Sequence, residues 1–233
     1  MSFMAPTDDA QTFQPLPGRA FDRSAYHALL RDLLDIVGAE PPAAEERVWH
    51  HRARRAVGDA VTRRANSAGS DGVPDEWFEP LLRAAVFEPD PSFSSQLVRP
   101  AVAAFGRRRV QLALIAYLET GTSVDAAGAA RAMYWTAVGV SYVPGSRNPT
   151  PESAAELEAV RDLYERYRHS ALRRFLTDDD LDLRRCILPR LTLDPAMYPT
   201  EMHDQVAQAV HIARTSSDDY LRHRVEIQIA PRA

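Results

Sequence analysis

The stretch that decides the fold is Asp180-Leu181-Asp182-Leu183-Arg184, which recurs in altered form as Asp218-Asp219-Tyr220-Leu221-Arg222. The Asp, Leu and Arg at its first, fourth and fifth positions each reappear 38 residues later (180→218, 183→221, 184→222). A period near that length is typical of one helical hairpin in a repeat protein, where successive hairpins stack on one another. The doubled phrase therefore predicts an array of stacked helices.

Apolar residues recur at helical spacing outside this phrase as well. The periodicity predicts helices over residues 26–37, 43–65, 74–87, 92–105, 107–118, 123–138, 151–176, 180–191, 199–215 and 218–228. Residues 138–143 and 225–229 alternate at a period of two, as strands do. An isolated strand pair is only marginally stable, so a long loop is favoured over residues 139–149 and a helix over residues 218–228.

Residues 1–22 contain several prolines and no sustained periodicity, so they are expected to form a flexible N-terminal arm. Residues 23–233 then form a single domain, with repeats clearest over residues 90–228. The predicted fold is all-α, a short right-handed α-solenoid of roughly five helical hairpins. Such a stack has one concave side, on which partners usually bind.

Composition excludes several kinds of enzyme. All 28 cationic residues of the 233-residue chain are Arg, and the absence of Lys excludes Schiff-base lysines and the phosphate-binding lysine of P-loop proteins. The net charge of −4 argues against general affinity for polyanions. With Cys186 as the single cysteine, an internal disulfide and a multi-cysteine zinc site are impossible, and a reducing compartment is expected.

The sequence gives no indication of a membrane or a cofactor. Its first residues lack the pattern of a signal peptide, and the longest apolar stretch, Val110 to Leu118, is too short to span a bilayer. A cytoplasmic protein without a membrane partner is expected. Asp178 to Asp182 resembles a calcium loop, but Leu183 and Pro189 stand where that motif requires Gly and Glu. Capping of a helix N-terminus explains these acids more simply, so no metal and no cofactor are expected.

The doubled phrase, together with Pro100, Pro189 and the run Phe105-Gly106-Arg107-Arg108-Arg109-Val110, resembles a HEAT-repeat protein. In that family an acidic residue caps the first helix of each repeat, and an apolar residue and an Arg follow three and four positions later. The resemblance implies that Arg184 and Arg222 bond to neighbouring repeats. The chain departs from the pattern at Gly128, which stands where the motif Arg falls, and in an insert near residues 139–150.

The resemblance implies a scaffold that binds a macromolecular partner, first of all a protein, on its concave face. In the HEAT family the second helices line that face, which here means residues 107–118, 151–176 and 199–215. The candidate contact residues are Arg108, Gln111, Arg168, Arg173, Asp204, Gln208 and His211. No catalytic residue is assigned, and whether the chain is an enzyme is left open.

Two further hypotheses stay open. Some HEAT-like proteins are DNA glycosylases that hold an alkylated base with a Trp and an acidic residue. Tyr134 and Trp135 are the aromatic candidates for such a site, and the arginine clusters suit a nucleic-acid partner, although core packing explains the aromatic pair more simply. The other hypothesis is a biosynthetic enzyme or accessory subunit, which would have a deep apolar pocket with convergent acids.

Overall fold

The computed structural model describes residues 23–43, 45–69 and 72–230, so the arm expected at residues 1–22 lies outside the described residues. The described residues contain no strand, which confirms the all-α prediction. The α-helices are α1 (Arg23–Ile36), α2 (Glu46–Ala68), α3 (Phe78–Phe87), α4 (Ser95–Phe105), α5 (Arg107–Thr120), α6 (Ser123–Met133), α7 (Pro151–Glu158), α8 (Arg161–Thr177), α9 (Leu181–Ile187), α10 (His203–Thr215) and α11 (Asp219–Ile229). Short 3-10 turns occur at η2 (Asp75–Trp77), η3 (Tyr134–Thr136), η4 (Leu188–Arg190), η5 (Pro195–Met197) and η6 (Thr200–Met202).

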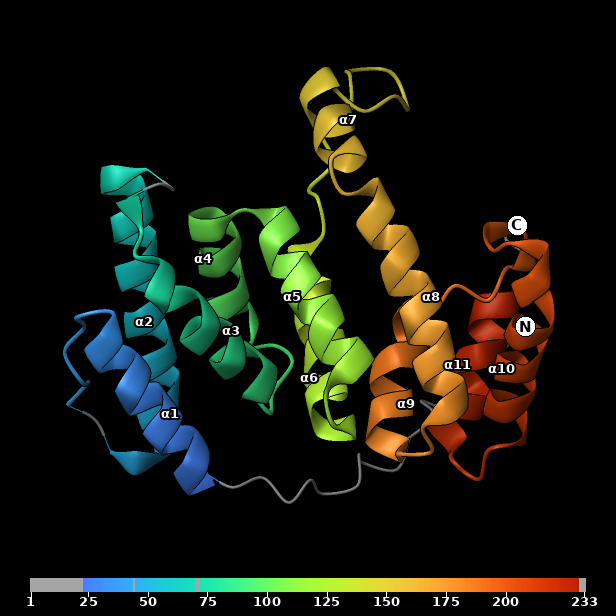
Figure 1. Ribbon diagram of the computed structural model, residues 1–233, viewed down its shortest axis with the longest axis horizontal. Coiled ribbons are helices and arrows are strands. Elements are labelled where there is room, and N and C mark those ends of the chain that lie inside the picture. The colour runs from blue at the N-terminus through green and yellow to red at the C-terminus, as the bar shows by residue number, and fades with distance from the viewer. Residues whose placement is uncertain (1–22, 44, 70–71, 231–233) are drawn as a thin grey trace, which may run out of the picture.

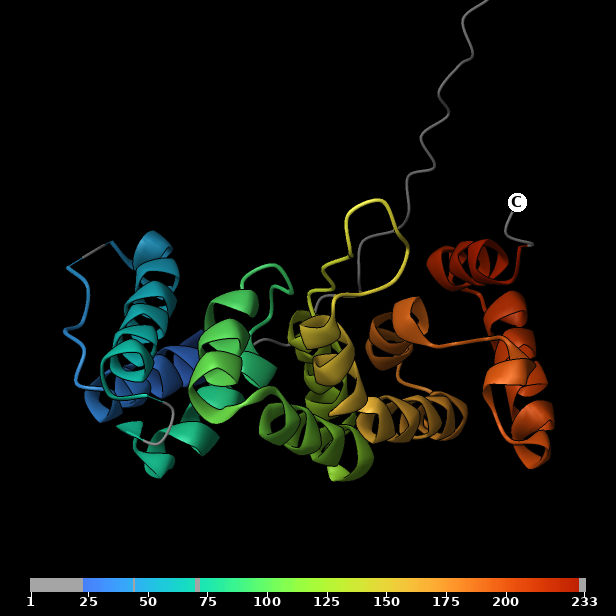
Figure 2. The ribbon, with the colours of Figure 1, turned by 90° about the horizontal axis from the view of Figure 1, so that it is seen from above.

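Helices pack in pairs that follow one another along the long axis of the molecule (Figure 1). The pairs are α1 with α2, α3 with α4, α5 with α6, α8 with α9, and α10 with α11. Figure 2 shows the first helices of the pairs in one row and the second helices in another. We call these rows layer A (α1, α3, α5, α8 and α10) and layer B (α2, α4, α6, α9 and α11). Both copies of the doubled phrase begin layer B helices.

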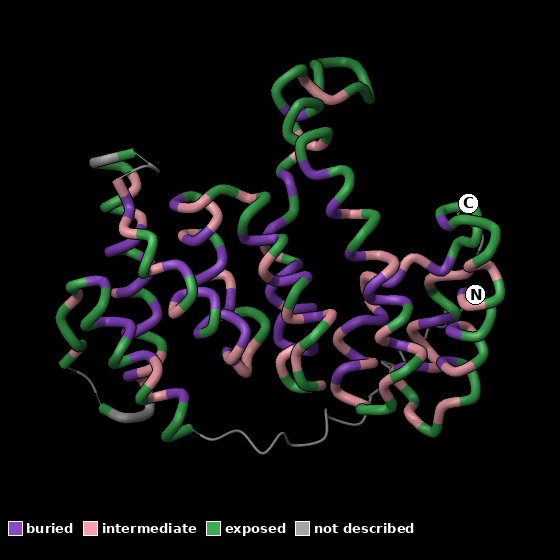
Figure 3. Tube along the Cα trace, viewed as in Figure 1, coloured by how far each residue is buried: buried purple, intermediate pink, exposed green. Residues whose placement is uncertain are grey.

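The apolar core lies between the two layers (Figure 3). Helix α6 is at its centre, because it packs against α3, α5 and α9. All of its buried residues before the terminal Met133 are correspondingly small: Ala126, Ala127, Gly128, Ala129, Ala130 and Ala132. A Cβ atom at Gly128 would stand 2.1 Å from the carbonyl oxygen of Val86 in α3. The departure from the repeat motif at Gly128 therefore has a packing reason, since any side chain there would push α6 away from α3.

The two copies of the doubled phrase have matching surroundings. Asp180 accepts a hydrogen bond of 2.8 Å from the backbone N–H of Leu183, and Asp218 accepts one of 3.0 Å from that of Leu221. Both acids are thus N-caps, as the sequence indicated, and they satisfy amides that the helix itself leaves free. Leu183 and Leu221 are both buried in the core.

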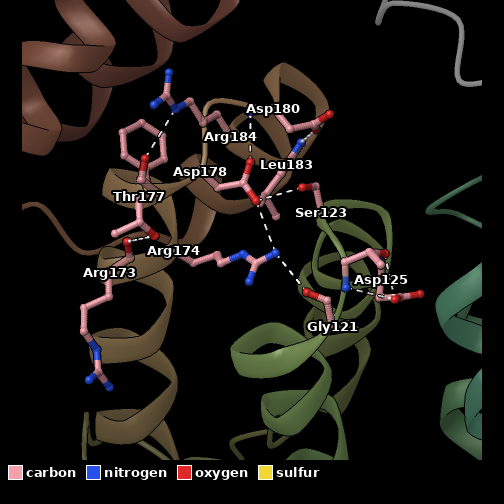
Figure 4. A network of polar contacts seen from close by, with 12 residues as sticks. Gly121, Ser123, Asp125, Arg173, Arg174, Thr177, Asp178, Asp180, Leu183 and Arg184 are labelled. Atoms are coloured by element: carbon pink, nitrogen blue, oxygen red, sulfur yellow. Dashed lines mark hydrogen bonds and ion pairs between the residues drawn. The ribbon is translucent and has the colours of Figure 1, made fainter.

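The arginines of the phrase both donate to a backbone carbonyl, although at different positions in the two copies. Arg184 donates to the carbonyl of Phe175 at 3.3 Å, and Arg222 donates to the carbonyl of Ser216. Each arginine therefore binds backbone near the end of the preceding helix, α8 or α10. Helix α6 has no such arginine, and the carbonyl of Gly121 at the end of α5 accepts instead from Arg174 of α8 at 2.9 Å (Figure 4).

Asp178 completes this contact between neighbouring pairs. Its carboxylate accepts from Ser123 at 2.8 Å and from the backbone N–H of Asp180 at 3.0 Å, and it lies 3.2 Å from Arg174 (Figure 4). Burial alone would raise the pKa of this carboxyl, but the two hydrogen bonds and the arginine outweigh it and lower the pKa. The turn between α5 and α6 is thereby fixed to the turn between α8 and α9.

One helix predicted over residues 151–176 is in fact two. Val160 leaves helical geometry at φ −126° and ψ 10°, and its side chain is buried. The break lets α8 pack against α5 while α7 projects beyond the layers (Figure 1), where Glu156 lies 3.5 Å from Arg107 of α5. The insert before α7 is an ordered loop, in which Val143 donates to Asn148 at 3.0 Å and Thr150 donates to Ser141 at 2.8 Å. Residues 225–229 belong to α11, as favoured.

Candidate functional site

The contact residues predicted for the concave face lie on α5, α8 and α10 of layer A, and they do not converge on one cavity. Arg108, Arg168 and Arg173 line three separate hollows. Gln111 is buried and donates to the hydroxyl of Thr136 at 3.1 Å, so it serves the core. The remaining three, Asp204, Gln208 and His211, are exposed along α10.

The arginine run at the start of α5 is engaged within the protein. Arg107 donates to the carbonyl of Ala137 at 2.8 Å, Arg108 forms two hydrogen bonds of 2.7 and 2.6 Å with Asp162, and Arg109 pairs with Asp75. The hydrogen bonds from Arg108 and Arg109 lower the pKa values of Asp162 and Asp75. Each arginine thus binds a different element. The run therefore links α5 to its neighbours and does not form an unpaired basic patch.

Tyr134 and Trp135 lie instead in a cavity of about 480 Å³ along layer B. Its walls come from the α3–α4 connection, α6, η3, α9, η4 and α11. The residues that line it are Pro91, Ser92, Ala130, Arg131, Tyr134, Trp135, Arg185, Cys186, Pro189, Arg190 and Tyr220. We call this cavity the layer B pocket. A concave, largely apolar cavity with a few charged groups is the usual form of a binding site.

The aromatic pair forms one wall of the layer B pocket. The indole N–H of Trp135 donates to the carbonyl of Pro91 at 2.9 Å, which fixes the ring. Tyr134 meets it edge to face with ring centroids 4.8 Å apart. Core packing, the simpler explanation of this pair, is wrong for Tyr134, because 56% of that residue is exposed. An exposed aromatic ring beside a cavity is a feature of recognition surfaces.

Two arginines of the pocket are compensated by acids. Arg185 and Asp218 form a buried pair, with side chains 6% and 7% exposed and an Nε to Oδ1 distance of 3.1 Å. Burial raises the pKa of Asp218, but the hydrogen bond from Arg185 and that from the Leu221 amide lower it below its usual value. Arg131 lies 3.8 Å from Asp182 and 3.3 Å from the sulfur of Cys186. These pairs join α6 to α9 and α9 to α11.

Two other arginines carry charge that no acid balances in the part of the chain that the structure describes. Arg190 is 5.6 Å from the ring centroid of Tyr134, and its Nε is buried without a hydrogen-bond partner. Arg99 covers the ring of Trp135 at 4.9 Å and is exposed. Neither has an acidic side chain within ion-pair distance among residues 23–43, 45–69 and 72–230. The arrangement therefore suits an anionic group bound next to an apolar or planar one.

Other kinds of site find no support in the described residues. No group of three or more His, Cys, Asp or Glu side chains among them is placed to hold a metal ion. No described helix combines the length and the low polarity that crossing a bilayer requires.

Sequence reasoning singled out Tyr134 and Trp135 but missed Arg99 and Arg190. Both arginines adjoin prolines that the sequence had marked, in Arg99-Pro100 and Pro189-Arg190. Proline bends or ends a helix, so each arginine lies where a helix departs from regular geometry. That adjacency was the one available signal, and it could not show that both arginines would meet the same aromatic pair.

Comparison with known proteins adds no relative from which a function could be transferred. No protein-family model, no curated protein and no solved structure matches this chain. The resemblance to HEAT repeats therefore stays a prediction.

Proposed function

We propose that this chain is a HEAT-like scaffold, a short right-handed α-solenoid of one domain over residues 23–233 that binds a partner protein. The alternation of helices between two layers supports the solenoid, because each pair contacts the next along the axis. The matching caps of Asp180 and Asp218 support it as well. A single cysteine fits work in the reducing cytoplasm.

In this proposal the partner binds at the layer B pocket. The residues of that pocket are the observation on which the proposal rests. The pocket offers an exposed Tyr, a Trp fixed by a hydrogen bond and arginines without acidic partners among the described residues. Tyr, Trp and Arg are the residue types that contribute most to protein–protein binding. The site differs from the face that the family resemblance implied. The hollows beside α5 and α8 are each lined by one aromatic residue at most, Phe105 or Tyr164, whereas the layer B pocket is lined by Tyr134, Trp135 and Tyr220.

The glycosylase alternative is less well supported by the same site. An alkylated base carries positive charge, and the arginines around Trp135 would repel it. Of the acids next to the pocket, Asp182 and Asp218 face Arg131 and Arg185, and Asp90 accepts from the backbone N–H of Ser92. Binding to duplex DNA at low salt would favour this alternative, and it should then weaken steeply as salt is added.

For the hypothesis of a small-molecule enzyme or accessory subunit, the cavity is the only supporting observation among the described residues. A volume of about 480 Å³ is adequate for a small ligand. The feature expected for this hypothesis was a set of convergent acids, whereas the lining residues include Arg131, Arg185 and Arg190 and no Asp or Glu. Turnover of a substrate by the purified chain would nevertheless decide in its favour.

Site-specific photocrosslinking in the native host tests the proposed function. Tyr134 is replaced by benzoylphenylalanine in the full chain, and crosslinked proteins are identified by mass spectrometry. We expect one protein to be captured repeatedly from position 134. The control places the same group at Leu112, an exposed apolar residue of α5 in layer A. Capture from position 112 alone would move the site to layer A, and capture from neither position would contradict a protein partner.

A further inference from the structure

A second cavity of about 530 Å³ lies between α2 and α4 of layer B. Arg99 belongs to both regions, because it lines the second cavity and covers the ring of Trp135. The second cavity also contains His51, Arg55 and Asp59. The two cavities therefore adjoin along layer B, and a bound segment that filled one could extend into the other.

The side chains that line the two cavities carry net positive charge once internal pairs are set aside. Asp90, next to Pro91, is the exception beside the pocket, and its carboxylate accepts from the backbone N–H of Ser92 at 2.8 Å. Asp218 pairs with Arg185 and Asp182 lies near Arg131, while Asp59 is 3.9 Å from Arg55. Arg190 and Arg99 are left without an acid among the described residues, one on each side of the aromatic wall. Opposite charge on a partner would be attracted to both positions and would fix its register.

The space between these arginines is apolar. Tyr134, Trp135, Pro91 and Pro189 surround it, and the indole N–H of Trp135 is already bonded to Pro91. Such walls favour a flat or bulky apolar side chain, because rings and prolines offer contact area without free hydrogen-bonding groups. An apolar anchor with acids on both sides is the chemical complement of this surface.

We propose that layer B binds an extended acidic segment of a partner protein, whose aromatic or bulky aliphatic side chain enters the layer B pocket while flanking carboxylates pair with Arg190 and Arg99. This inference rests on the proposed function and names the partner's chemistry. A protein segment fits better than a nucleic acid, because the net charge of −4 opposes a long polyanion whereas two local arginines match a short acidic run.

Fluorescence anisotropy with the full chain and a labelled probe peptide tests the proposal. The probe carries one central tryptophan between two runs of glutamate. We expect saturable binding that weakens by about tenfold when alanine replaces the tryptophan or glutamine replaces the glutamates. Arg190→Gln and Arg99→Gln should each weaken binding by roughly fivefold, as expected for partly exposed charge pairs. Arg99 is exposed and Arg190 is half-buried, so circular dichroism is used to check that both variants remain folded.

Arg147→Gln is the matched control, since Arg147 is an exposed arginine of the loop before α7 with no ion-pair partner among the described residues. Its binding curve should equal that of the unmodified chain. Equal affinity for the glutamine peptide, or insensitivity to both Arg190→Gln and Arg99→Gln, would overturn the proposal. So would displacement of the probe by a single-stranded oligonucleotide at far lower concentration. Crosslinking at position 134 without binding of the probe would overturn the acidic segment alone and leave the protein partner standing.

Discussion

At the scale of single residues, a buried carboxylate joins parts of the chain that are distant in sequence. Glu88 is 1% exposed and accepts from the Tyr26 hydroxyl at 2.5 Å and from Arg54 at 2.7 Å. It connects α1 and α2 to the loop that carries Pro91, and the backbone carbonyl of Glu88 accepts from Arg131. One wall of the layer B pocket therefore depends on this network.

Removing the charge of Glu88 should be costly. In the variant Glu88→Gln the guanidinium of Arg54 stays buried without its counter-ion, and we expect a loss of about 3 kcal/mol in the free energy of unfolding. Urea denaturation followed by circular dichroism measures this loss. Glu76→Gln, at an exposed acid of η2, is the control and should change stability by less than about 0.5 kcal/mol. Equal stabilities for the two variants would show that the network contributes nothing.

Substitutions at Asp218 and Asp180 distinguish the effect of a buried ion pair on stability from that of a helix cap. Both acids cap a helix, but only Asp218 also pairs with a buried arginine. Asparagine still caps a helix, so Asp218→Asn removes mainly the charge, and we expect a loss of about 3 kcal/mol at neutral pH. Asp180→Asn should cost less than about 1 kcal/mol. Similar losses for the two variants would contradict a specific role of the Arg185 pair.

Because the pKa of Asp218 is lowered, the contribution of the Arg185–Asp218 pair to the free energy of unfolding depends on pH. Because the folded pKa is below the unfolded value of about 3.9, the contribution to stability is complete above that pH. It is lost as the pH falls through the lowered, folded pKa. The difference in unfolding free energy between the unmodified chain and Asp218→Asn should therefore shrink between pH 5 and strongly acidic solution. Denaturation curves at a series of pH values measure it, and a constant difference would contradict the ion pair as its source.

At the scale of the elements, most helix positions followed from the sequence, because caps and apolar periodicity are local signals. Asp180, Asp218 and the Thr150-Pro151 start all begin helices where predicted. The break at Val160 was missed, since it depends on the packing of α8 against α5, which local periodicity does not contain. The expected hairpin of residues 92–105 with residues 107–118 is present, since α4 contacts α5, but the closer packing of α5 against α6 was missed for the same reason.

The contact of α6 with α3 can be tested at a single glycine. In Gly128→Ala the new methyl group would meet the backbone of Val86, which cannot move as a side chain can. We expect a destabilisation of about 2 kcal/mol from this overpacking, and weaker binding at the layer B pocket because α6 carries Tyr134 at its end. Gly139→Ala is the control, since a Cβ atom there meets nothing within 4 Å. An unchanged melting temperature in Gly128→Ala would show that α6 shifts without cost.

At the scale of the whole molecule, the sequence could predict the aromatic residues of the candidate site but not its arginines. Tyr134 and Trp135 are adjacent in sequence, so their association needs no knowledge of the fold. Arg99 and Arg190 come from α4 and η4 and reach the pair only because layer B brings those elements together. The layer A residues from Arg108 to His211 were chosen by family resemblance, and no observation yet tests them as contacts.

A stacked array also predicts how the molecule unfolds. When each pair contacts only its neighbours, a defect at one end should loosen that end before it reaches the other. Leu221→Ala, at a buried residue of α11, should therefore raise amide hydrogen exchange in α10 and α11 much more than in α1 and α2. Leu30→Ala, at a buried residue of α1, should raise amide hydrogen exchange in α1 and α2 much more than in α10 and α11. Hydrogen exchange measured by mass spectrometry resolves these regions. A uniform rise across all helices in both variants would indicate one cooperative globular unit and would contradict the solenoid.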